Sequence, residues 1–120
     1  MNTRELFDLS GRVAIVTGGS IGLGRDMADA LADMGASLVL CARQKERCQQ
    51  AADELTARGA RAIQRACNVA DPQDARALVE AAVSAFGRID VLVNNAGIAW
   101  GRSVEEMGVE AWNKVLETNL

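Results

Sequence analysis

The sequence predicts an α/β fold built on a doubly wound parallel sheet. Four short apolar runs, which begin at Val13, Ser37, Ala62 and Ile89, recur at intervals of about 24–28 residues. The segments between them carry apolar residues at helical spacing. Alternating strands and helices predict stacked βαβ units, and right-handed crossovers place helices on both faces of the sheet.

The predicted strands cover residues 13–16, 37–41, 62–63 and 89–93. The first, second and fourth are continuously apolar or nearly so, as is typical of strands buried on both faces. The third is weak by itself and depends on its place in the series. We expect a strand order of 3-2-1-4, although periodicity alone also allows a flavodoxin-like order.

Each of the three predicted helices has one apolar face. The faces comprise Leu23, Met27, Leu31 and Met34; Cys48, Ala51, Ala52 and Leu55; and Leu78, Val79, Ala82, Val83 and Phe86. A glycine follows each helix, where a left-handed residue commonly ends one: Gly35, Gly59 and Gly87. Asp is favoured at the N-cap of a helix and Pro in its first turn, so Asp71 and Pro72 predict the start of the third helix.

The residue pattern in the last part of the chain predicts two further helices, the first of them short. Ser103 and Glu106 have the spacing of a capping box. A longer helix is expected from near Val109, with Trp112, Val115, Leu116 and Asn119 on one face. A fold of about four strands would leave one sheet edge and two helix faces uncovered. We therefore expect residues 1–120 to form a single domain, and this domain to be the N-terminal portion of a longer fold.

Composition excludes several kinds of protein. The 120 residues contain no His and no Tyr, so neither an imidazole nor a phenol is available for proton transfer, and a His-ligated metal site is excluded. A net charge of -3 argues against nucleic-acid binding. No segment has the apolar pattern of a signal peptide or membrane span. Three cysteines without a C-x-x-C pair predict buried thiols in a reducing cytoplasm and no metal.

The strongest motif is the glycine turn, residues 17–24 (TGGSIGLG), between the first strand and the first helix. This context is typical of dinucleotide binding. Gly18 permits the tight turn, Gly22 lets the backbone approach a pyrophosphate, and Gly24 lets the helix pack close to the sheet. The helix N-terminus then offers N–H groups and a positive dipole end to the phosphates.

Two further segments lie where the cofactor would reach the sheet. A carboxylate after the second strand would bind the ribose 2′-hydroxyl of NAD, but Ala42 and Arg43 stand there. Because a guanidinium suits a 2′-phosphate, NADP is favoured over NAD. Residues 94–97 (NNAG) follow the fourth strand, and with order 3-2-1-4 they lie beside the glycine turn at the topological switch point.

These motifs, together with Trp112-x-x-Val115-x-x-x-Asn119-Leu120, resemble the N-terminal half of a short-chain dehydrogenase/reductase of the compact branch. The resemblance implies a Rossmann-type fold and hydride transfer between NAD(P) and a carbonyl or alcohol carbon. It implies cofactor-binding roles for Gly18, Ser20, Ile21, Gly22, Gly24, Arg43, Asn68, Val69, Asn95, Ala96 and Gly97. Asn119 matches the catalytic asparagine of the family, which helps to hold a water in the proton relay.

The chain departs from the family pattern in three ways. The Tyr-x-x-x-Lys of the catalytic group is absent, and Lys114 precedes Asn119. Ile21 stands where many NADP-dependent relatives carry arginine. Asn68 stands where relatives often have an aspartate that contacts adenine, although an amide oxygen can also accept that hydrogen bond.

The most similar members in appearance are sugar-acid dehydrogenases of the gluconate 5-dehydrogenase type and 3-oxoacyl-carrier-protein reductases. We therefore expect an oxidoreductase that acts on a small carbonyl or secondary alcohol, and that forms homo-oligomers when complete. The alternative is a non-catalytic dinucleotide-binding module or an inactive fragment, which the missing tyrosine favours. The retained Asn119 argues against that alternative.

Overall fold

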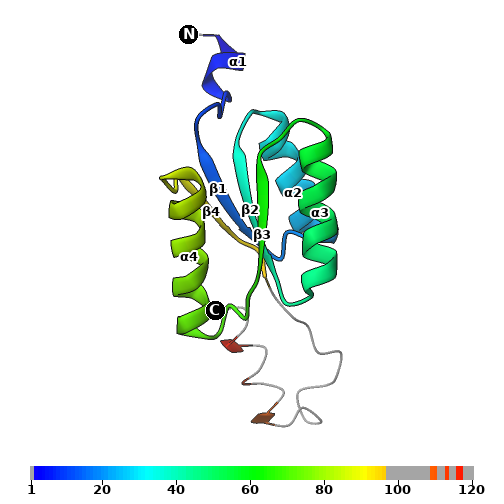
Figure 1. Cartoon of the computed structure of the whole chain (residues 1–120), viewed down its shortest axis with the longest axis vertical. Helices are drawn as coiled ribbons and strands as arrows, with labels where there is room; N and C mark the ends of the chain where they lie inside the picture. Colours follow the sequence, from blue (N-terminus) through cyan, green and yellow to red (C-terminus); the bar gives the residue numbers. More distant parts are fainter. Residues whose placement is uncertain (1, 97–108, 111–112, 114–115, 118–120) are drawn as a thin grey trace.

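The sheet is parallel, with helices on both of its faces (Figure 1). The structure, a computed structural model, describes residues 2–96, 109, 110, 113, 116 and 117. Its elements are α1 (Thr3–Leu6), β1 (Val13–Thr17), α2 (Gly22–Asp33), β2 (Ser37–Ala42), α3 (Lys45–Ala57), β3 (Ala62–Ala66), α4 (Pro72–Phe86) and β4 (Val91–Asn94). All the strands and helices expected between Val13 and Asn94 are present, whereas the short α1 was not expected.

The strand order is β3-β2-β1-β4, which confirms the predicted order and excludes the flavodoxin-like alternative. β1 lies between β2 and β4, with Ile15 paired to Val39 on one side and to Leu92 on the other. β2 pairs in turn with β3. Figure 1 shows α2 and α3 on one face of the sheet and α4 on the other. The carboxyl ends of all four strands therefore meet at one edge of the sheet.

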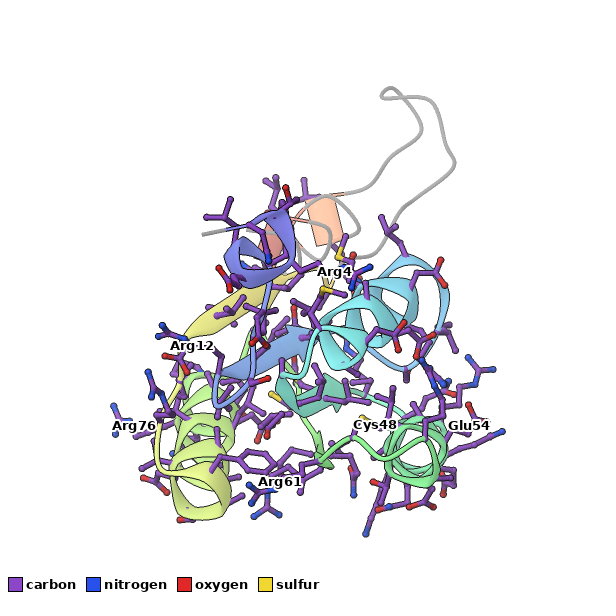
Figure 2. All side chains as sticks on the ribbon, turned by 90° about the horizontal axis from the view of Figure 1, so that it is seen from above. Arg4, Arg12, Cys48, Glu54, Arg61 and Arg76 are labelled. Atoms are coloured by element: carbon purple, nitrogen blue, oxygen red, sulfur yellow. The ribbon has the colours of Figure 1, made fainter. Side chains whose placement is uncertain are left out.

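The strands divide their side chains between two cores. Ala14 and Val16 of β1 pack toward α2 and α3, whereas Val13 and Ile15 pack toward α4. Cys48 of α3 is fully buried on the sheet side of its helix, and Glu54 lies on the opposite, exposed side (Figure 2). The predicted apolar face of α3 is confirmed, because all four of its residues are buried.

The predicted face of α2 is partly wrong. Leu23 and Met34 are 64% and 45% exposed, and the buried residues of α2 are Gly24 and Ala28. Hydrophobicity alone favoured the large side chains, but a small-residue face lets the helix approach the sheet more closely. Leu31 remains partly buried against the core.

The interpretation of α4 and β4 needs a similar correction. α4 buries Leu78, Ala81 and Ala82, but Val79 and Val83 are exposed. Leu92 of β4 is 63% exposed, so this strand is not buried on both faces. The reason is positional: β4 is the last strand of the described sheet, and no described element covers that side.

The predicted helix ends are confirmed. Gly35, Gly59 and Gly87 have φ values of 99°, 92° and 79°. The Asp71 side chain accepts a hydrogen bond of 2.9 Å from the backbone N–H of Gln73, and Pro72 occupies the first turn. The three glycines thus follow the ends of α2, α3 and α4, and Asp71 and Pro72 mark the start of α4.

Part of the C-terminal prediction can be compared with the structure. The described residues from Val109 onward are helical, in agreement with the predicted helix: Val109, Glu110, Asn113, Leu116 and Glu117. Ser103, Glu106, Trp112 and Val115 lie outside the described residues. Among the residues described, no helix combines the length and hydropathy needed to cross a bilayer.

Candidate cofactor-binding site

A cleft with a volume of about 500 Å³ opens at the carboxyl edge of the sheet. Residues at the carboxyl ends of the four strands and in the connections after them line it: Gly18, Ser20, Ile21, Cys41, Ala42, Arg43, Gln44, Arg47, Cys67, Val69, Asn95 and Ala96. Most of the predicted cofactor-binding residues therefore lie around one space. Gly22, Gly24 and Asn68 lie outside the lining, while Gly97 and Asn119 fall outside the described residues.

The glycine turn needs glycine for two different reasons. Gly18 and Gly22 have φ values of 67° and 60°, in the left-handed region that side chains disfavour. Gly24 has no room for a side chain, because a Cβ there would collide with the Gly18 carbonyl and the Asn95 amide. At Gly22, by contrast, a Cβ would meet no atom within 4 Å. The backbone at Gly22 is thus open for the close approach of a ligand.

Thr17 joins the glycine turn to the loop after β4. Its hydroxyl oxygen accepts hydrogen bonds from the backbone N–H groups of Asn95, at 2.9 Å, and Ala96, at 3.0 Å. The same hydroxyl lies 3.3 Å from the Val93 carbonyl, to which it can donate. Asn95 completes the link by donating from its side chain to the Gly18 carbonyl at 3.4 Å. Thr17 is only 5% exposed, so this connection is shielded from water.

The two helices that begin at the cleft have no side-chain caps. The N-cap residues are Ile21 for α2 and Gln44 for α3, and neither side chain bonds to a first-turn N–H group. In α1 and α4 the caps are Asn2 and Asp71, and both accept such bonds. The first turn of α2 thus presents N–H groups and a positive dipole end without a side-chain acceptor, which favours an anionic ligand.

The charge of the cleft differs from that of the whole chain. The chain has a net charge of -3, but the described lining contains Arg43 and Arg47 and no Asp or Glu. Sequence reasoning found Arg43 and missed Arg47. The available signal was the spacing, because residues four apart at the start of a helix lie near one another.

The floor of the cleft contains two thiols. Cys41 and Cys67 are buried, belong to the same core cluster and form no disulfide. Burial raises the pKa of Cys41 and also that of Cys67, so both remain neutral thiols near pH 7. They therefore pack as small apolar groups and leave Arg43 and Arg47 as the charged residues of the described lining. The described residues also contain no cluster of His, Cys, Asp and Glu that could hold a metal ion.

Asn68 is held within its own turn. Its backbone N–H donates to the Asp74 carboxylate at 2.9 Å, and its side-chain oxygen accepts from the Ala70 N–H at 3.0 Å. The oxygen expected to contact adenine is thus already used in the turn, although a carbonyl oxygen has a second lone pair. Its neighbour Val69 lines the cleft. The adenine contact of Asn68 stays a prediction.

The chain matches known proteins along almost all of its length. The family model described as short chain dehydrogenase matches residues 12–120. The rhamnolipids biosynthesis 3-oxoacyl-[acyl-carrier-protein] reductase of Pseudomonas aeruginosa is 41% identical over 115 residues, covering 95% of this chain and 44% of that protein. The chain thus spans less than half the length of this relative.

Solved structures have the same fold. A short-chain type dehydrogenase/reductase from Mycobacterium marinum matches with a TM-score of 0.95 and 35% identity, over 100% of this chain and 49% of that one. A short chain dehydrogenase/reductase from Burkholderia phymatum, solved in complex with NAD, matches with a TM-score of 0.90 and 34% identity. That match covers 94% of this chain and 40% of the other.

Proposed function

Because the chain belongs to the short-chain dehydrogenase family, we propose that it forms the cofactor-binding part of an NADP(H)-dependent oxidoreductase. The cofactor supplies or accepts a hydride, and the other reactant is a small carbonyl compound or secondary alcohol. The observation that carries the proposal is the cleft itself. It joins an uncapped helix N-terminus to a basic lining that contains no described carboxylate.

The residues of the cleft fit a dinucleotide in three places. The open backbone at Gly22 and the N-terminus of α2 suit the pyrophosphate. Arg43, directly after β2, suits a 2′-phosphate on the adenine ribose. Asn95 and Ala96, held by Thr17, form the wall at the switch point, and Gly97 continues this loop. We propose binding roles for these residues and for Gly18, Ser20, Ile21, Gly24, Asn68 and Val69.

The chemical step on the substrate requires further residues of the complete protein. We propose Asn119 as the residue that positions a water for proton transfer, with the proton donor outside residues 1–120, because these contain no tyrosine or histidine. The proposed substrates are of the 3-oxoacyl or sugar-acid type. We further propose a homo-oligomer that works in the cytoplasm, where its three free, buried cysteines stay reduced.

The test of the proposed function is Arg43→Ala in the complete gene product. We expect weaker NADPH binding by roughly 10- to 150-fold, because a charged hydrogen-bond partner contributes about 1.5–3 kcal/mol. NADH, which lacks the 2′-phosphate, should lose much less affinity. Isothermal titration calorimetry measures both dissociation constants.

Arg76→Ala is the matched control, since Arg76 is exposed on α4 and lies outside the cleft lining. It removes the same charge and should leave the ratio of NADPH to NADH affinity unchanged. Equal losses for both cofactors in Arg43→Ala would show that Arg43 does not contact the 2′-phosphate.

A second candidate function is dinucleotide binding without catalysis. The observation that favours it is the absence of tyrosine from the 120 residues. The intact mass of the native protein, with the gene read past codon 120, separates the two functions. A continuation through a serine to Tyr-x-x-x-Lys supports the oxidoreductase, whereas a native protein without that motif leaves only binding.

A further inference from the structure

We infer that Arg47 is a second specificity-determining residue, which forms with Arg43 a two-guanidinium subsite for the 2′-phosphate of NADP. This inference rests on the proposed function and deepens it. It assigns recognition of the phosphate to the start of α3 and not to the glycine turn. The argument depends on the position of Arg47, the charges around it and its effect on its own helix.

Arg47 lies in the same part of the cleft as Arg43. Arg43 directly precedes the N-cap residue Gln44, and Arg47 is the third residue of α3. Helical side chains lean toward the N-terminus of their helix, so Arg47 extends back over the turn that contains Gln44. In agreement, Arg43, Gln44 and Arg47 all line the cleft.

The charges around Arg47 leave it available for an anion. Two other arginines of this layer are engaged: Arg25 pairs with Asp29 and Glu54, and Arg58 pairs with Asp29 and Asp33. Within the described part of the chain, Arg47 forms no such ion pair and is exposed. No described carboxylate lines the cleft to neutralise it.

The helix dipole gives Arg47 no stabilising role at the start of α3. A cation in the first turn of a helix opposes the positive end of the helix dipole, at a cost of roughly 0.3–1 kcal/mol at exposed positions. Gln44 provides no side-chain cap that would compensate for this, and Glu46 is the one acidic residue in the first turn of α3. A bound phosphate would reverse the sign of the effect, since an anion at this end is stabilised by both the dipole and the guanidinium.

Among the described residues, the opposite wall of the cleft contains no alternative cation. Its residues from the glycine turn are Gly18, Ser20 and Ile21, and Ile21 is 57% exposed and apolar. The residues after β3 and β4 that line the cleft are also uncharged: Cys67, Val69, Asn95 and Ala96. Among the residues that the structure describes, Arg47 is therefore the available second donor for a phosphate that Arg43 binds.

The experiment compares adenosine 2′,5′-bisphosphate with AMP, two probes that differ only in the 2′-phosphate. Their dissociation constants are measured by calorimetry on the complete gene product. In Arg47→Gln we expect the bisphosphate to bind about tenfold more weakly, as for the loss of one charged hydrogen-bond partner. AMP should change by less than about twofold, and its binding shows that the cleft is folded.

Lys45→Gln is the matched control, because it removes a positive charge from the same helical turn but from outside the cleft lining. It should leave the preference for the bisphosphate unchanged. The melting temperature of Arg47→Gln should equal or exceed that of the unmodified protein, since the substitution removes an unfavourable charge from the helix start. A role of Arg47 in holding the fold would instead lower it.

The outcomes separate this inference from the proposed function. If the unmodified protein prefers the bisphosphate and only Arg43→Gln reduces that preference, the Arg47 subsite is refuted and NADP binding stands. An equal loss in Lys45→Gln would also refute it, because the effect would then be one of general charge. If the unmodified protein shows no preference, NADP specificity fails and the subsite fails with it.

Discussion

Single residues around the cleft carry roles that their chemistry explains. Thr17 is a polar residue in a strand that is buried along its whole length, and its hydroxyl is used by two backbone N–H groups from another loop. Gly24 is required because the Gly18 carbonyl and Asn95 amide occupy the space of a side chain. These contacts fix the distance between the glycine turn and the loop after β4. The shape of the cleft thus depends on a hydroxyl and a missing Cβ.

Thr17→Val is expected to lower the free energy of unfolding by about 1–3 kcal/mol, because the N–H groups of Asn95 and Ala96 lose their acceptor while the side-chain shape is kept. NADPH affinity should also fall, since Asn95 and Ala96 line the cleft. Thermal denaturation and calorimetry of the complete protein measure the two effects.

Thr17→Ser is the matched control. It retains the hydroxyl and removes one buried methyl group, which costs about 0.8 kcal/mol. A valine variant as stable as the serine variant would contradict the role assigned to the hydroxyl.

At the scale of elements, side-chain caps and ion pairs stabilise the ends of some helices and strands and not of others. α1 and α4 have side-chain caps, whereas α2 and α3, whose N-cap residues Ile21 and Gln44 line the cleft, begin without them. At the opposite edge of the sheet, Asp90 ties the start of β1 to the start of β4. Its carboxylate accepts from the Val13 N–H at 2.9 Å and from Arg88 at 2.6 Å, and its own N–H donates to the Val13 carbonyl at 2.9 Å.

Asp90→Asn is expected to lower the melting temperature at pH 7 and to have little effect in acid. The Arg88 guanidinium and the Val13 N–H hold the pKa of Asp90 below its usual value. A carboxyl whose pKa is lowered by folding stabilises the protein above its unfolded pKa of about 3.9. That contribution is lost as the pH falls through the lowered pKa of the folded state. Melting curves from pH 7 down to about pH 3 measure the change.

The control is Asp26→Asn, which changes an exposed carboxylate on α2. It should not reproduce the pH-dependent difference. A difference for Asp90→Asn that is the same at both ends of the pH range would show that Asp90 does not act through its charge.

At the scale of the molecule, the described strands and helices form the candidate site but leave apolar side chains of α4 and β4 exposed. Four strand ends meet at one edge, and the connections after them surround the cleft. Three large apolar residues of α4 and β4 are exposed: Val79, Val83 and Leu92. The relatives that the chain matches are more than twice its length. We therefore expect binding and chemistry to be separable in this protein.

Purified residues 1–120 should show no turnover of NADPH with 3-oxoacyl thioesters or sugar ketones. The reason is chemical, since these residues contain no tyrosine or histidine to deliver the proton. Absorbance at 340 nm measures the reaction, and the complete gene product assayed in parallel is the control. Carbonyl-dependent oxidation of NADPH by the purified fragment would overturn the assignment of the proton donor to another part of the protein.

The sequence by itself determined the elements, the parallel sheet and the end of the sheet at which the candidate site lies. Continuous apolar runs, terminal glycines such as Gly87 and the glycine turn are local signals, and they need only neighbouring residues to act. Arg43 was found in the same way, because it directly follows a recognisable strand. Gly97 and Asn119 lie outside the described residues, and their roles remain predictions.

Only the tertiary structure decided which surfaces are covered and which residues meet across the cleft. Periodicity identifies an apolar face but not its partner, so Leu23 and Val79 were expected to be buried and are exposed. The strand order came from pairing between strands far apart in the sequence. The same holds for Thr17 and Arg47. The sheet places Thr17 beside the Asn95 N–H group and places Arg47 in the cleft with residues of other strand ends. Contacts between distant segments depend on packing in three dimensions, which no local pattern encodes.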